Sequence, residues 1–80
     1  MSGFIKFGTF LVSTRAVTAI KAHPGQGRVV VHCSINRPQI FVLECGPGEE
    51  EWTADDIARR IHLDAAVLNL TSMLNPDYEE

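Results

Sequence analysis

The sequence has few cysteines and no long apolar run. Its 80 residues include two cysteines, Cys33 and Cys45, which are too few for a disulfide framework. No segment approaches the ~20 apolar residues of a membrane span. The start, MSGFIKFG, has one lysine, and the apolar run that follows is too short for a signal peptide. We therefore expect a soluble cytoplasmic protein with reduced thiols and no contact with a membrane.

Motifs that carry catalysis or metal binding are also missing. The histidines and cysteines show neither C-x2-C nor H-x3-H spacing. His32 and Cys33 are neighbours in a predicted strand, so their side chains point to opposite faces and cannot form a catalytic couple. The glycine-rich stretch HPGQGR matches no phosphate-binding motif and predicts a turn. We expect no enzyme activity, no catalytic residue, no metal site and no cofactor.

The first 43 residues contain no aspartate or glutamate. Their five basic residues are Lys6, Arg15, Lys21, Arg28 and Arg37. Residues 44–80 hold all ten acidic residues against Arg59 and Arg60, so the two parts carry +5 and −8, and the whole chain −3. Such a basic part attracts polyanions, whereas the acidic part repels them. We favour the alternative explanation, in which the two parts attract each other within the fold or between subunits.

Four apolar stretches predict β-strands. They are FIKFGTFLVS (residues 4–13), AVTAIKA (16–22), RVVVHCSI (28–35) and QIFVLEC (39–45). Turn signals, HPGQG and NRPQ, join the last three. We predict an α+β domain in which a three- to four-stranded antiparallel β-meander packs against a C-terminal helix or helix pair. A single domain would span residues 1–75, β-rich over 1–46 and helical over 52–75, followed by an acidic tail over 76–80.

The predicted helical region has a residue suited to begin a helix, and its apolar residues change from one helix face to another along the segment. Thr53 is a suitable N-cap residue. The apolar residues form two stripes, Ile57 with Ile61, and Val67 with Leu70 and Leu74. Because the second stripe is displaced around the helix axis, it predicts either a break near residues 62–64, with Asp64 capping a second helix, or one bent helix.

The expected register of the last hairpin pairs Ile35 with Ile40. It places Cys33 and Cys45 on opposite faces, although a change of one residue in the loop would reverse the faces. Because a domain of this size has a thin core, oligomerisation is a standard support. We expect a homo-oligomer, dimeric or larger, or a protein partner. The predicted contact residues, on the second sheet face and the last helix, are Phe10, His32, Phe41, Leu43, Val67, Leu70, Met73 and Leu74.

The segment TADDIARRIHLDAAVLNLTSML (residues 53–74) resembles the second and third helices of winged-helix and related bacterial repressors. The resemblance implies DNA reading. However, the outward positions of the second helix contain no arginine or lysine, and only Asn69 suits a base edge. Phosphate contacts, which dominate affinity in such complexes, have no source here. Another route to nucleic acid uses the five basic residues of the predicted sheet, with Phe4, Phe7, Phe10 or Phe41 as stacking platforms.

Residues 10–62 resemble the small FlbD/SwrD-type flagellar proteins. The resemblance rests on the order of FLVSTRAVTAIKAHPGQGRVVVHCSI, QIFVLEC and EEEWTADDIARRI. This chain has NRPQ in place of the common NG hairpin turn, and we expect an extra helix after His62. The resemblance implies a β-meander with a helix, and an accessory or assembly protein without catalytic residues.

These features lead to one functional prediction and one alternative. We predict a small, non-enzymatic, cytoplasmic protein that acts through self-association and protein–protein interaction. The alternative is a nucleic-acid-binding or transcription-regulating protein that uses the basic sheet or the helix pair over residues 53–74.

Overall fold

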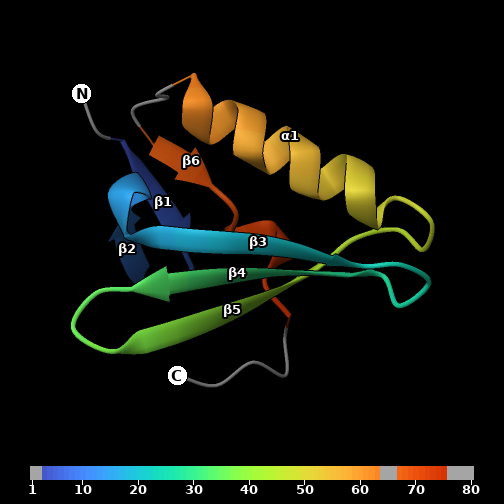
Figure 1. Ribbon diagram of the computed structural model, residues 1–80, viewed down its shortest axis with the longest axis horizontal. Helices are drawn as coiled ribbons and strands as arrows, with labels where there is room; N and C mark the ends of the chain where they lie inside the picture. Colours follow the sequence, from blue (N-terminus) through green and yellow to red (C-terminus); the bar gives the residue numbers. More distant parts are fainter. Residues whose placement is uncertain (1–2, 64–66, 76–80) are drawn as a thin grey trace.

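The computed structural model describes residues 3–63 and 67–75 (Figure 1). Its strands are β1 (Phe4–Phe7), β2 (Phe10–Ser13), β3 (Val17–His23), β4 (Arg28–Ser34), β5 (Pro38–Glu44) and β6 (Val67–Asn69). The helix is α1 (Glu50–His62), and two 3-10 turns are η1 (Thr14–Ala16) and η2 (Thr71–Met73). The predicted α+β class is confirmed. The predicted cap Asp64 and the predicted acidic tail over 76–80 lie outside the described residues.

The described strands form two three-stranded sheets instead of one meander. β3, β4 and β5 pair antiparallel in chain order, as predicted. β1 pairs antiparallel with β2 on one side and parallel with β6 on the other. The first and last of the described strands are therefore hydrogen-bonded neighbours, and they lie side by side in Figure 1.

The predicted helix pair was wrong. The helix begins at Glu50, before the predicted cap Thr53, and ends at His62. The region expected to form the second helix contains strand β6, in which Leu68 is buried and its neighbours Val67 and Asn69 are exposed. This alternation has the two-residue period of a strand, and the spacing of Val67, Leu70 and Leu74 matched a helical period only by coincidence.

The core lies between the two sheets and beneath α1. Ile5, Phe7 and Val12 point into it from the first sheet, and Val29, Val31, Phe41 and Leu43 from the second. Ile57 closes the core from α1, which packs against β3 and β4. The rings of Phe7 and Phe41 are stacked with centroids 4.1 Å apart, and Phe10 meets Phe41 edge-on at 5.5 Å. Both geometries are favourable for aromatic pairs, so Phe41 joins the two sheets.

The predicted register of the β4–β5 hairpin was also wrong. Ile40 is the partner of His32, and Phe41 is the partner of Val31. The strands separate at Ser34 and Pro38, which leaves a loop one residue shorter than expected and exchanges the faces. This register buries the large Phe41 side chain, and it puts proline at the first residue of a strand, where it is tolerated.

Both cysteines therefore contact the core from the same side of the sheet, contrary to the prediction. Both are free thiols, Cys33 fully buried and Cys45 partly buried. Burial raises the pKa of the Cys33 thiol. This thiol consequently behaves as a small apolar side chain.

The buried carboxylate of Glu50 forms hydrogen bonds that connect the start of α1 to the turn at Gly27 and to the turn at Gly48. Its Oε2 accepts a hydrogen bond from the Gly27 N–H at 2.7 Å, and its Oε1 accepts one from the Gly48 N–H at 3.0 Å. Hydrogen bonds from the backbone of Glu50 itself and of Gly27 lower the pKa of this carboxyl, despite the opposing effect of burial. Gly27 has φ of +67°, and a Cβ there would lie 3.0 Å from the Cys45 carbonyl oxygen. Glycine is thus required where the β3–β4 turn meets the helix.

The observed register makes a prediction about two adjacent residues. Phe41→Ala removes a fully buried ring and is expected to lower the free energy of unfolding by about 3–5 kcal/mol. Ile40→Ala, on the opposite face, is expected to lower it by less than about 1.5 kcal/mol. Urea unfolding followed by circular dichroism measures both. Equal losses for the two variants would contradict the register.

The Glu50 contacts predict a pH dependence of stability. The carboxyl has an ordinary pKa of about 4.3 in the unfolded chain and a lower pKa in the folded protein. Its stabilising contribution is therefore complete above the unfolded value, and it is lost as the pH falls through the folded value. Glu50→Gln is expected to destabilise the protein at neutral pH and to flatten this acid dependence.

Urea unfolding between about pH 7 and pH 3 tests this expectation. Glu51→Gln is the matched control, because Glu51 is the next residue of the same helix and is exposed. It is expected to keep the acid dependence of the parent protein. The same dependence in all three proteins would show that Glu50 does not contribute to it.

Candidate protein interaction surfaces

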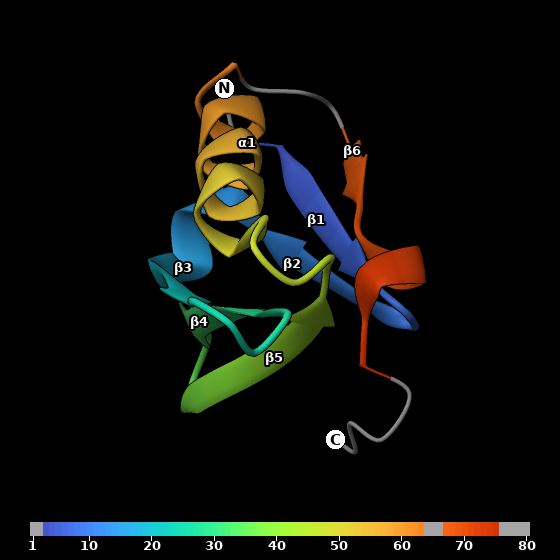
Figure 2. The same cartoon turned by 90° about the vertical axis from the view of Figure 1, so that its right-hand side faces the viewer.

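One face of the β3–β4–β5 sheet is left uncovered by the described residues. In the observed register, two adjacent central rows of side chains point to it, between the pair Arg28–Glu44 at one end and the pair Ser34–Pro38 at the other. The rows are Ala19, His32 and Ile40, and Lys21, Val30 and Val42. We call these six residues the outer sheet face. Figure 2 shows α1, β1 and β2 together on the other side of this sheet.

The centre of the outer sheet face is apolar. Val30 and Val42 are cross-strand partners and half-buried, and Ile40 is 46% exposed. A sheet face in contact with water usually carries polar side chains at these positions. A contiguous apolar patch with a polar rim is typical of an interaction site. The sequence did not reveal this apolar patch, because the predicted register placed Ile40 and Val42 on the face opposite to His32. Only the correct register would have indicated it.

The predicted contact residues fall into three groups. Phe41, Leu43 and Leu70 are buried in the core. Phe10, Met73 and Leu74 are partly buried and pack against that core. His32 lies on the outer sheet face, and Val67, which is 54% exposed, lies beside Phe4 on the other sheet.

The five predicted basic residues are all exposed but do not converge on one surface. Lys21 and Arg28 are diagonal neighbours on the β3–β4 pair. Arg37 lies in the turn at the far end of the same sheet, Arg15 in η1 and Lys6 on β1. Within the described parts of the chain, no ion pair joins these residues to the acidic second half. Attraction between the two halves therefore does not act through salt bridges there.

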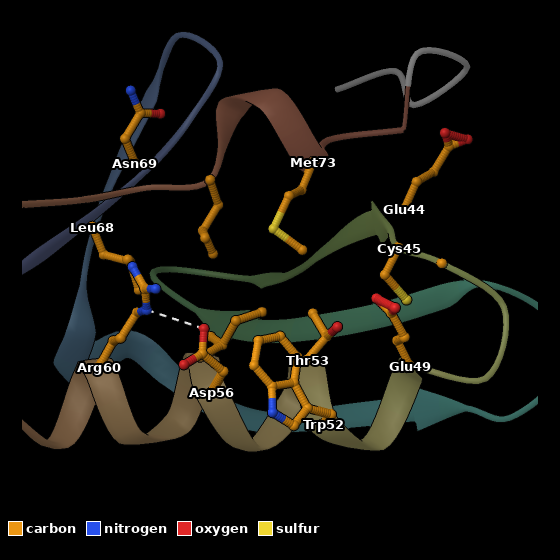
Figure 3. Close-up of a pocket in the computed structure, with 13 residues that line it drawn as sticks. Glu44, Cys45, Glu49, Trp52, Thr53, Asp56, Arg60, Leu68, Asn69 and Met73 are labelled. Atoms are coloured by element: carbon orange, nitrogen blue, oxygen red, sulfur yellow. Dashed lines mark hydrogen bonds and ion pairs between the residues drawn. The ribbon is translucent and has the colours of Figure 1, made fainter.

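A second surface is a groove that runs between α1 and the segment from β6 to η2 (Figure 3). Its cavity volume is about 350 Å³. The lining residues, which we call the α1–β6 groove, are Glu44, Cys45, Gly46, Glu49, Trp52, Thr53, Asp56, Ile57, Arg60, Leu68, Asn69, Leu70 and Met73. Figure 3 shows Glu44, Cys45 and Glu49 at one end and Arg60 with Leu68 at the other. This groove was not predicted, because β6 was expected to be part of a helix.

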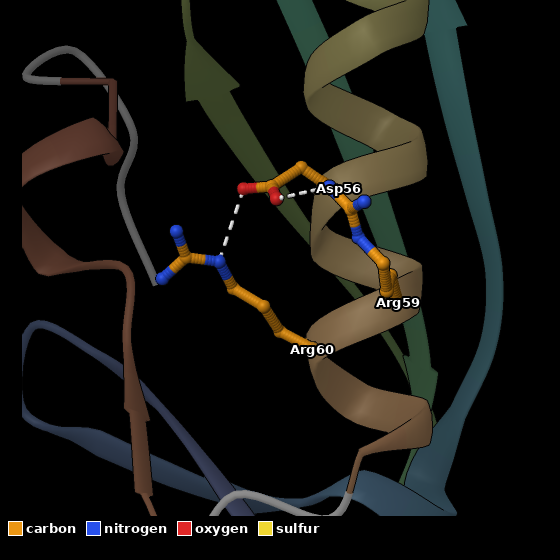
Figure 4. A network of polar contacts seen from close by, with 3 residues as sticks. All are labelled: Asp56, Arg59 and Arg60. Carbon is orange, nitrogen blue, oxygen red and sulfur yellow. Dashed lines mark hydrogen bonds and ion pairs between the residues drawn. The ribbon is translucent and has the colours of Figure 1, made fainter.

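The carboxylates of the groove differ in their partners. Asp56 Oδ1 accepts a hydrogen bond from Arg59 Nη2, and Asp56 Oδ2 accepts one from Arg60 Nε, both at 3.0 Å (Figure 4). At the other end, Glu49 forms no ion pair with the residues that the structure describes, and Glu44 lies opposite Arg28 in the β4–β5 ladder. The carboxylate of Glu49 is therefore the uncompensated charge at that end of the groove.

Residues 3–63 and 67–75 contain neither a membrane-spanning helix nor a group of metal-binding side chains. No helix in these ranges has the length and apolar character needed to cross a membrane. No group of three or more His, Cys, Asp or Glu side chains there is placed to hold a metal ion.

Comparison with known protein families, with curated proteins and with solved structures finds no match to this chain. The resemblance to flagellar proteins thus remains a prediction of the sequence, whereas the helix pair on which the resemblance to bacterial repressors rests is not formed, because β6 lies where its second helix was expected.

Proposed function

We propose that this is a small, cytoplasmic, non-enzymatic protein that acts through self-association and protein–protein contacts, with the outer sheet face as its contact surface. The observation that carries the proposal is the adjacent placement of Val30, Ile40 and Val42 on a face that no described element covers. Burying such side chains against another chain removes apolar surface from water. The free thiols Cys33 and Cys45 fit a reducing compartment.

The size of the face bears on the strength of association. Three strands of seven residues have a footprint of roughly 350 Å² at ordinary strand spacing. A standard stable interface buries about 800 Å² on each partner. The proposed self-association is accordingly weak and depends on protein concentration.

Nucleic-acid binding is the second candidate, and Lys21 and Arg28 favour it, because they are diagonal neighbours and form no ion pair within the described residues, although Glu44 lies opposite Arg28. Two observations weigh against it. Phe7 and Phe41, two of the proposed stacking platforms, are buried in the core. The repressor-like helix pair does not form, because β6 lies where its second helix was expected.

The first test changes the centre of the outer sheet face. Ile40→Glu puts a charge into the proposed contact and is expected to abolish the rise of the sedimentation coefficient with protein concentration. Leu11→Glu is the matched control, since Leu11 is 57% exposed on a strand of the other sheet. It is expected to associate like the parent protein. Association unaffected by Ile40→Glu, or lost in Leu11→Glu, would refute the proposed surface; circular dichroism verifies that both variants fold.

The second test addresses nucleic acid directly. We expect no saturable anisotropy change when the protein is titrated at low salt into a labelled mixed-sequence duplex or single strand. Non-specific binders have Kd values of about 10⁻⁴–10⁻⁶ M even at physiological salt, so low salt favours detection. Binding that weakens with salt and is reduced by Lys21→Gln with Arg28→Gln would replace the assembly proposal.

A further inference from the structure

Trp52 is the one tryptophan of the sequence, and its side chain is 64% exposed at the rim of the α1–β6 groove. Tryptophan is on average a highly buried residue. It is also the residue type most enriched among the energetic centres of protein interfaces. An exposed tryptophan beside a cavity therefore points to a partner that covers it.

The helix face toward the groove has a regular order. Glu49, Trp52, Thr53, Asp56 and Arg60 follow the three- and four-residue spacing of one helix face. Across from them, Leu68, Leu70 and Met73 supply apolar surface from β6 and η2. The groove thus combines an apolar floor with a polar rim, which is the usual composition of a binding site.

The charges of the groove residues indicate which ligand charge the groove favours. Asp56 is compensated by Arg59 and Arg60, and Glu44 lies opposite Arg28 on the neighbouring strand, whereas Glu49 forms no ion pair with the described residues. A cation near the Glu49 carboxylate would gain attraction, and an anion would be repelled. The face of Trp52, on the same stretch of the rim (Figure 3), attracts cations as well.

We propose that the α1–β6 groove binds an extended apolar peptide segment of a partner protein through one lysine or arginine side chain of that segment. The basic side chain lies along Trp52 and directs its charge to Glu49. The apolar residues beside it pack on Leu68, Leu70 and Met73. The cavity of about 350 Å³ accommodates a few side chains and is at the lower limit of ligand pockets.

Trp52 is itself the probe for this proposal. An acetylated and amidated peptide Ala-Leu-Lys-Leu-Ala is titrated into the full chain while the tryptophan emission is recorded. We expect a saturable blue shift, because the peptide covers an exposed indole. The matched peptide with glutamine in place of lysine is expected to bind at least about tenfold more weakly, and the glutamate version not to bind.

Matched variants separate local from long-range charge effects. Glu49→Gln is expected to weaken binding of the lysine peptide about tenfold or more. Glu51→Gln removes the same charge from an exposed position of α1 that does not line the groove. This control is expected to bind within about twofold of the parent. Trp52→Leu, followed by the anisotropy of a fluorescein-labelled peptide, is expected to bind more weakly, because it keeps an apolar side chain but loses the aromatic face.

Several results would overturn the proposal. They are equal affinity for the lysine and glutamine peptides, equal weakening by Glu49→Gln and Glu51→Gln, and a tryptophan shift that follows protein concentration alone. The last result would assign the groove to a second copy of the chain. Ile40→Glu is expected to bind the lysine peptide like the parent protein, so the groove and the outer sheet face can fail separately.

Discussion

The stacking of Phe41 on Phe7 is the interaction on which the arrangement of the two sheets depends. Phe41 reaches the core from β5 and Phe7 from β1, and their ring centroids are 4.1 Å apart. Because side chains alternate along a strand, an inward Phe41 requires Ile40 and Val42 to point outward. The apolar outer sheet face is therefore a direct consequence of the way in which the core is packed.

The opposite charges of the two halves of the chain meet at one end of the β3–β4–β5 sheet. Arg28 and Glu44 are cross-strand partners there, whereas Glu49 lies at one end of the α1–β6 groove. The ion pairs in the described residues remain within α1, between Asp56 and its two arginine neighbours. The groove therefore keeps one carboxylate, that of Glu49, without a charged neighbour of opposite sign.

The inward orientation of Glu50 explains why its neighbour Glu49 lies at the groove. Acidic residues at the start of a helix stabilise its N-terminus, and the sequence places Glu49, Glu50 and Glu51 there. Only Glu50 turns inward, where its carboxylate accepts hydrogen bonds from the N–H groups of Gly27 and Gly48. Its neighbour Glu49 consequently lies at the groove, which leaves an uncompensated carboxylate beside Trp52.

The sequence alone determined the elements that depend on local interactions. The alternating apolar residues predicted β3, β4 and β5, the glycines of HPGQG predicted their turn, and the acidic start with Ile57 predicted a helix. Tertiary structure decided which face of β5 is buried, because a change of one residue in the loop exchanges Ile40 and Phe41. It also decided that Val67 to Asn69 form a strand, because that strand exists only by pairing with β1, whose Phe4 lies opposite Val67. Hydrogen bonds between the two ends of a chain have no local signal, so the groove that β6 forms with α1 could be recognised only in the folded protein.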